Sequence, residues 1–298
     1  MRATSPELGR SGVRLSEDDW RPRAELHDRR VAAWTEPHLR RRSRHERHPV
    51  EDFLWEYYSY SPKALRTWHP GWGVTLTGDV AGFATVRGYL VDGVTARVDP
   101  ALAARRADQL RWIRDLLVAT ESRPARLGCF GLHEWAMVYR LGADQPRHTQ
   151  VPLRLGPAGT DAVVESHRIT CTHYDAYRFF APDAAPRNTL RPTLDARVAN
   201  EQPGCLHAQM DAYKWAHKLA PFTPAELVAD CFELAREIRV LDMRASPYDL
   251  SEWGYSPVAI ETASGKADYV AAQRSFARRA SGLRQRIVRV CDAVLDGC

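Results

Sequence analysis

Histidine and carboxylate side chains are concentrated in the middle of this chain. Six of the 11 histidines lie between Cys129 and Lys218, and most of them have an aspartate or glutamate close by in the sequence. Imidazoles and carboxylates are the side chains that transfer protons and bind transition metals. Their density here predicts a reaction site rather than an ordinary structural core, and therefore an enzyme.

The first group of these side chains is spread over residues 165–175. If the segment is extended, alternate side chains share one face, and that face carries Glu165, His167, Cys171, His173 and Asp175. Such a row suits one or two metal ions or a proton relay. If residues 161–168 are helical instead, Glu165 and His167 diverge. The structural alternative is a half-buried strand whose histidines hydrogen-bond the backbone.

The second group lies on a helix expected over about residues 205–219. His207 and Asp211 are four residues apart and Lys214 follows three residues later, so all three share one stripe of the helix. A histidine and an aspartate one turn apart can chelate a metal or act as an acid–base pair. The lysine supplies a nucleophile or a charge that binds phosphate. The alternative is an exposed ion pair without chemistry.

A third group is the pair His133 and Glu134. It matches the start of the zinc-protease signature H-E-x-x-H, but position 137 is Met, so the signature fails. Because neighbouring helical residues point about 100° apart, one of the two is expected to face a given site. The chain has no G-x-G-x-x-G, P-loop, G-x-S-x-G or zinc-deaminase P-C-x-x-C motif.

These groups and their neighbours supply the candidate site residues. The expected catalytic residues are Glu134, Glu165, His173, Asp175, Asp211 and Lys214. If the enzyme is metal-dependent, an ion of Fe, Zn or Mn is expected on His133, His167, His173, Asp175, His207 and Asp211. Substrate contacts are expected from Trp68, Asn188 and Arg191. Asp242 falls on the apolar face of a later helix, where a structural salt bridge to an arginine of a neighbouring helix is expected.

The elements that must position these residues are mainly helices. Apolar residues recur at helical spacing over about residues 22–44, 100–117, 205–219, 224–241 and 266–295. Residues 74–98 change to strand-like patterns, and Asp92-Gly93 indicates a tight hairpin turn. The pattern predicts an α+β fold that is predominantly α-helical with a small antiparallel β element.

Length and composition bound the organisation of the chain. With 298 residues and 44% hydrophobic content, we expect a disordered tail over residues 1–18 and a single mainly helical catalytic domain over residues 19–298. No apolar run reaches the 18 or so residues of a membrane span. The first 20 residues lack the apolar core of a signal peptide, so a cytoplasmic protein without membrane association is expected. The six scattered cysteines fit reduced thiols.

Positive charge is concentrated near the N-terminus. Residues 21–47 hold nine arginines and four acidic residues, a net charge of +5 that equals the charge of the whole chain. Phosphate contacts of a nucleic acid or nucleoside substrate are expected from Arg40, Arg41, Arg42 and Arg44. The alternative is a solvated helix end.

Three long segments carry a family resemblance: HPVEDFL at residues 48–54, GCFGLHEWAM at 128–137 and EQPGCLH at 201–207. With them, over about residues 20–297, the chain resembles a family of actinobacterial proteins that commonly carry the name 3-methyladenine DNA glycosylase. The chain has no Gly-rich L-P-G-x-G hairpin, so the resemblance is not to the helix-hairpin-helix glycosylases. It implies a hydrolase of DNA repair that cleaves the N-glycosidic bond of an alkylated purine.

Two functions therefore stand side by side. In the glycosylase that the resemblance implies, Asp175 or Asp211 activates water or stabilises the cationic sugar, aromatic rings stack the base, and no cofactor is required. The alternative is a metal-dependent hydrolase or oxygenase, with one or two ions, that acts on a small molecule. A non-enzymatic binding protein is a third possibility, but a binding groove does not need so many titratable groups.

Overall fold

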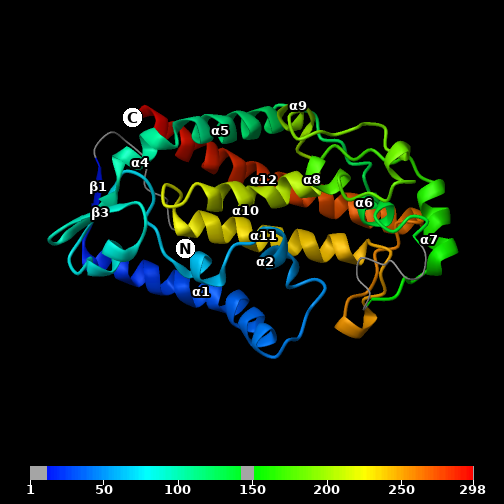
Figure 1. The fold of residues 1–298 in the computed structure, drawn as a ribbon, viewed down its shortest axis with the longest axis horizontal. Coiled ribbons are helices and arrows are strands. Elements are labelled where there is room, and N and C mark those ends of the chain that lie inside the picture. The colour runs from blue at the N-terminus through cyan, green and yellow to red at the C-terminus, as the bar shows by residue number, and fades with distance from the viewer. Residues whose placement is uncertain (1–11, 142–150, 298) are drawn as a thin grey trace.

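The computed structural model describes residues 12–141 and 151–297, which form a helical bundle with a small sheet at one end (Figure 1). The long helices are α1 (Glu17–Ser43), α5 (Ala107–Glu121), α10 (Leu206–Lys218), α11 (Ala225–Arg244) and α12 (Ala263–Asp296). Helix α12 packs against α5, α10 and α11, while α10 also packs on α11. Helix α1 lies on the outside against α11. The prediction of a predominantly helical α+β fold is confirmed.

The helix faces follow the apolar periodicity of the sequence. On α11, Leu227, Cys231, Leu234 and Ile238 are all buried, as predicted. Each of these leucine and isoleucine side chains contributes roughly 1.5–3 kcal/mol to stability when fully buried. Helix α10 differs, because every residue from Leu206 to Tyr213 is buried. Its polar residues therefore lie inside the protein and require partners there.

The sheet contains β1 (Val13–Leu15), β2 (Val74–Thr77), β3 (Tyr89–Asp92) and β4 (Thr95–Val98) in the order β1-β2-β4-β3. The predicted hairpin is present as β3 and β4, and β2 is antiparallel to β4. Strand β1 instead pairs parallel to β2, which is possible because α1 and the segment after it supply the long crossover that parallel strands need. The sheet is thus mixed rather than purely antiparallel.

The prediction of a disordered tail over residues 1–18 is wrong for residues 13–18. Val13–Leu15 form β1, and Ser16 and Asp19 form a capping box that starts α1. A capping box satisfies backbone N–H groups that the first helical turn leaves without partners. Residues 1–11 lie outside the described part of the chain.

Short elements complete the bundle. Helices α2 (Phe53–Tyr57) and α3 (Pro62–Arg66) pack on α11. At the sheet end, η1 (Ala81–Thr85) packs against β3, and α4 (Pro100–Arg105) follows β4. The opposite end holds α6 (Leu132–Ala136), α7 (Gly156–Glu165), α8 (Tyr174–Tyr177), η2 (Ala185–Arg187), α9 (Arg197–Asn200) and η3 (Ser251–Trp253). There, α6, α8 and α9 surround the start of α10, close to the end of α11 (Figure 1). Within the described ranges, no helix is long and apolar enough to cross a membrane.

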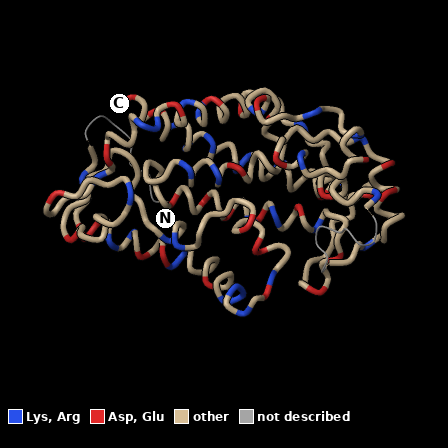
Figure 2. Tube along the Cα trace, viewed as in Figure 1, with Lys and Arg blue, Asp and Glu red and all other residues tan. Residues whose placement is uncertain are grey.

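Charged residues of both signs are interspersed over the fold, and basic residues gather at the C-terminal end of α1 (Figure 2). Of the four arginines expected to contact phosphate, Arg41 is paired with Asp52 at 2.5 Å. Arg40 lies 3.7 Å from Glu36 in an exposed pair, and Arg42 and Arg44 are exposed. Arg41 is therefore occupied by a structural ion pair. For Arg40, Arg42 and Arg44, the phosphate contact stays a prediction.

Candidate metal centre

Two histidines and one aspartate from three helices meet at the end of the bundle opposite the sheet. His133 belongs to α6, His207 to the first turn of α10 and Asp242 to the last turn of α11. Each offers one ligand atom, and these atoms lie within 4.8 Å of one another. His133 Nε2 is 3.1 Å from Asp242 Oδ1, and the two imidazole centroids are 4.4 Å apart. The side chains are 2%, 6% and 0% exposed.

The local backbone explains how His133 reaches this position. Gly131 precedes α6 with a φ of +70°, a left-handed conformation that glycine adopts without steric strain. The turn starts a helix of only five residues, all of them buried. Both members of the His133–Glu134 pair consequently lie at the centre, whereas the prediction allowed only one of them to face it.

Arg239 supports the centre from the same helix as Asp242. Its Nη1 donates to Asp242 Oδ2 at 3.2 Å and to Glu134 Oε1 at 2.7 Å. The prediction that Asp242 pairs with an arginine of a neighbouring helix is therefore wrong, because Arg239 is one turn earlier on α11. The neighbouring helix supplies His133 instead. Glu134, predicted to be catalytic, holds Arg239 in place.

Burial and charge set the protonation of the three side chains. Burial alone would raise the pKa of Asp242, but His133, His207 and Arg239 hold that pKa below its usual value. Burial opposes a charge on His133, yet Asp242 raises the pKa of His133 well above its ordinary value. Burial and the neighbouring His133 lower the pKa of His207 well below the ordinary value. Without a metal, an imidazolium–carboxylate pair thus lies beside a neutral imidazole.

A small cavity gives access to both imidazoles. Its lining consists of Arg126, Cys129, His133, Thr170, Cys171, Thr172, Gln202, Cys205, Leu206, His207 and Tyr269. The centre of a water-sized molecule has about 10 Å³ in which to move, which is the space of about one water. A molecule or ligand atom about the size of one water can therefore lie beside His133 and His207.

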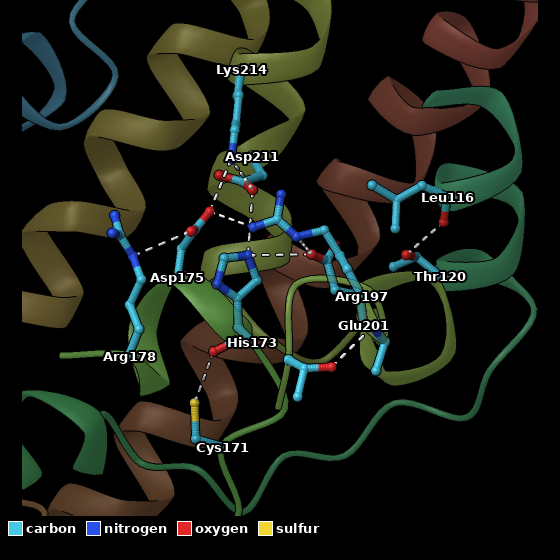
Figure 3. A network of polar contacts seen from close by, with 12 residues as sticks. Leu116, Thr120, Cys171, His173, Asp175, Arg178, Arg197, Glu201, Asp211 and Lys214 are labelled. Carbon is cyan, nitrogen blue, oxygen red and sulfur yellow. Dashed lines mark hydrogen bonds and ion pairs between the residues drawn. The ribbon is translucent and has the colours of Figure 1, made fainter. Parts of the chain in front are cut away.

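A second network of charged side chains lies next to this centre (Figure 3). His173 Nε2 is 3.3 Å from Asp211 Oδ2 and 3.5 Å from Glu201 Oε1. Lys214 Nζ donates to Asp175 Oδ2 at 3.0 Å and to Asp211 Oδ2 at 3.3 Å. The His173 ring centroid is 5.3 Å from that of His207, so the two clusters adjoin.

The second network has its own cations. Arg197 contacts both Asp175 and Glu201, and Tyr58 donates its hydroxyl to Asp211 Oδ1 at 2.8 Å. Although His173, Asp175 and Asp211 also lie within 4.8 Å of one another, a metal there would compete with two fixed cations for the carboxylate oxygens. This arrangement favours a structural ion network over a metal site.

The same cations lower the pKa values of two acidic residues in this network. Burial alone would raise the pKa of Asp211, but Lys214, His173 and Arg197 hold that pKa below its usual value. Burial also opposes ionisation of Asp175, and Lys214 and Arg197 again hold its pKa below the usual value. For Glu201 burial is the larger effect and raises the pKa to about 6.

The predicted row over residues 165–175 is not extended. Helix α7 ends at Glu165, residues 166–173 are irregular, and Asp175 lies in the first turn of α8. His173 and Asp175 reach the second network. Glu165 instead accepts hydrogen bonds from Tyr139 and Arg140 at the surface. His167 donates through Nδ1 to Val163 O, within its own turn, so neither Glu165 nor His167 belongs to the site.

The three predicted substrate contacts have other positions. Trp68 packs with Ala225 in the core beside the sheet and donates to Glu226. Asp242 follows Ala225 by 17 residues on α11, so Trp68 and Asp242 are separated by about 25 Å along the helix. Asn188 binds the backbone N–H and C=O of Cys171 and so shapes the loop. Arg191 is exposed.

Sequence reasoning missed Asp242 as a candidate ligand, together with Tyr58, Arg197 and Glu201 in the second network. A carboxylate on an apolar helix face was the signal available for Asp242. Tyr58 follows Leu54 at helical spacing and so has the pattern of a core residue, and Arg197 and Glu201 follow a proline-containing segment without periodicity. Comparison of the chain with protein-family models, curated proteins and solved structures finds no match in any of the three.

Proposed function

We propose that the protein is a metal-dependent enzyme whose centre is one divalent cation bound by His133, His207 and Asp242. The observation that carries this proposal is the convergence of the three ligand atoms within 4.8 Å beside a cavity. Two histidines and one carboxylate with open positions are the ligand set of non-haem Fe(II) oxygenases, and His/carboxylate sets also serve catalytic zinc.

The charge of the cluster supports a cation at this place. Glu134 and Asp242 provide two carboxylates and Arg239 one guanidinium, so with neutral imidazoles the cluster carries a net charge of −1. Without metal, a proton on His133 compensates this charge. A divalent cation replaces that proton, and the 3.1 Å between His133 Nε2 and Asp242 Oδ1 is close to the roughly 3.0–3.5 Å that bonds of about 2.1 Å to one metal ion require.

The chemistry of such a centre follows from its open side. A bound cation lowers the pKa of a coordinated water toward neutrality and so supplies hydroxide, or it binds oxygen if it is redox-active. The protein contributes the fixed ligands, the Arg239–Glu134 support behind Asp242, and a narrow cavity that limits the size of the reactant. This supports hydrolysis or oxygen chemistry on a small molecule.

The glycosylase that the resemblance implies has less support from the geometry. Glycosylases take an extruded base into a pocket beside the catalytic carboxylate. Asp211 is 1% exposed and His173 is fully buried, and the cavity beside His207 has room for about one water. A purine would have to displace the packing around α10. Cleavage of alkylated purines therefore stays a prediction from the resemblance alone.

Elemental analysis of the full chain, purified without chelators or added metal, tests the proposal. We expect close to one equivalent of Fe, Zn or Mn per chain, removable by a chelator and restored by the ion alone. A metal-free protein that takes up no ion and releases 3-methyladenine from alkylated DNA would establish the glycosylase and exclude the metal centre.

Metal affinity is expected to rise with pH. The raised pKa of His133 means that His133 carries a proton in the metal-free protein at neutral pH, and metal binding must release it. The apparent affinity should then rise about tenfold per pH unit until the pH passes the pKa of His133. Titration with zinc against a chromophoric chelator from pH 6 to 8 measures this slope. A pH-independent affinity would show that His133 is not a ligand.

A further inference from the structure

The cavity beside the metal centre is lined by positive and neutral groups. Its charged lining residue is Arg126, and no carboxylate is among the lining residues that the structure describes. Asp242 lies behind the two histidines. The thiols of Cys171 and Cys205 stay neutral, because burial raises the pKa of each. With a divalent cation in place, this wall attracts an anion.

Arg126 has a fixed backbone and an unpaired guanidinium. Its backbone N–H donates to Gln202 Oε1 at 2.9 Å, and its carbonyl accepts from Gln202 Nε2 at 3.3 Å. The side chain is exposed, and among residues 12–141 and 151–297 no carboxylate forms a salt bridge with it. Because Arg126 lines the cavity and its guanidinium is unpaired, that guanidinium is available to a ligand that extends out of the cavity.

The wall that carries Arg126 is closely packed. A Cβ on Gly204 would lie 2.4 Å from Arg126 O, so only glycine permits this approach of the two segments. Gln273 Nε2 in turn donates to Gly204 O at 2.5 Å. These contacts link residue 126 to the loop before α10, and α10 carries His207 in its first turn. The distance between Arg126 and the metal ligands is thus set by the fold.

Thr172 supplies an independent observation inside the same cavity. Its side chain is 5% exposed and lines the cavity. Its Oγ1 has no hydrogen-bond partner within the described residues. Buried hydroxyls usually have a partner, because an unsatisfied one retains its full desolvation cost. A ligand oxygen in the cavity would provide that partner.

We propose that the metal centre acts on, or is occupied by, a small carboxylate or similar oxyanion that binds between the metal and the guanidinium of Arg126, with the Thr172 hydroxyl as a second donor. This inference rests on the metal centre proposed above. Because the cavity has room for about one water, one carboxylate oxygen fills it, and the rest of a small anion such as formate or acetate extends toward the exposed side chain of Arg126. The same anion cancels the positive charge that a divalent cation leaves on the cluster.

Acetate binding to the cobalt(II)-loaded full-length protein tests this inference. Cobalt content is measured first, and the visible spectrum is then followed during titration with acetate, with neutral acetamide as the reference ligand. We expect acetate to change the cobalt spectrum and acetamide to leave it unchanged. Arg126→Gln should weaken acetate binding at least about tenfold, as expected for loss of a charge-assisted hydrogen bond, and Thr172→Val should weaken it less.

The controls separate this proposal from the metal centre itself. Arg126→Lys keeps the charge and should retain part of the affinity, while Arg111→Gln removes an exposed arginine on α5 and should change nothing. If cobalt loads but acetate binds Arg126→Gln as tightly as the native protein, or binds neither, the anion site is excluded and the metal centre stands. If cobalt does not load at all, both proposals fail.

Discussion

Replacing His207 with alanine is expected to abolish metal binding. His207 is one of the three proposed ligands, and its imidazole is already neutral near pH 7, because burial and His133 lower its pKa. Loss of a ligand should weaken binding by more than the 10–100-fold that follows removal of an outer-shell partner. We expect the metal content of purified His207→Ala protein to fall from about one equivalent to near zero, as measured by elemental analysis.

His167→Ala is the matched control for this experiment. His167 was an equally plausible ligand from the sequence, but its ring bonds to Val163 O within its own turn. The variant should keep its metal. Circular dichroism and thermal unfolding of both variants check that the fold is intact. Full metal content in His207→Ala, or loss of metal in His167→Ala alone, would contradict the assignment of the ligands.

Asp211→Asn is expected to destabilise the protein strongly without removing the metal. The substitution removes a carboxylate that is 1% exposed and takes from Lys214 and His173 one of the two carboxylates that each contacts. Breaking a buried ion pair from one side costs about 3–5 kcal/mol, and the lower part of that range applies because Lys214 keeps Asp175 and His173 keeps Glu201. Urea-induced unfolding should show a decrease of that size in the free energy of unfolding.

The amide keeps the shape of the carboxylate, so the loss of charge dominates the effect. Glu165→Gln provides the comparison, because Glu165 pairs with Arg140 at the surface and its removal should have little effect on unfolding. A second substitution, Lys214→Met, made in the Asp211→Asn background, should recover part of the stability, because it removes a cation that has lost one of its two carboxylate partners. Loss of metal in a folded Asp211→Asn protein would instead place the ion in the second network.

The two clusters have different tasks in this arrangement. The His133–His207–Asp242 set has a side at the cavity, and in the proposed metal centre His133 gives up its proton when the ion binds. In the second network, Lys214 and Arg197 occupy the carboxylates of Asp175 and Glu201. His207 and Asp211 are one turn apart on α10, so the second network anchors the helix that presents the ligand.

The elements with strong local signals could be predicted from sequence. The apolar periodicity of α11 and the Asp92-Gly93 turn between β3 and β4 both correspond to observed elements. Local patterns specify such elements, because burial of one face and the turn conformation depend on near neighbours. The segment 165–175 lacked a strong signal. Its split into the end of α7, an irregular stretch and α8 depends on contacts such as that of Asn188 with Cys171.

The sequence by itself determined which reactive side chains the protein has. They are histidines and carboxylates near positions 133, 173 and 207, with His207 and Asp211 on one stripe of a single helix. Only the tertiary structure decided which of them act together. Asp242, 35 residues after His207, reaches it because α10 and α11 pack side by side, and His133 joins them from α6. Residues this far apart in the sequence produce no periodic pattern that would predict their contact. The packing of the helices likewise decides that Lys214 and Arg197 lie at the second network and not beside His133, His207 and Asp242.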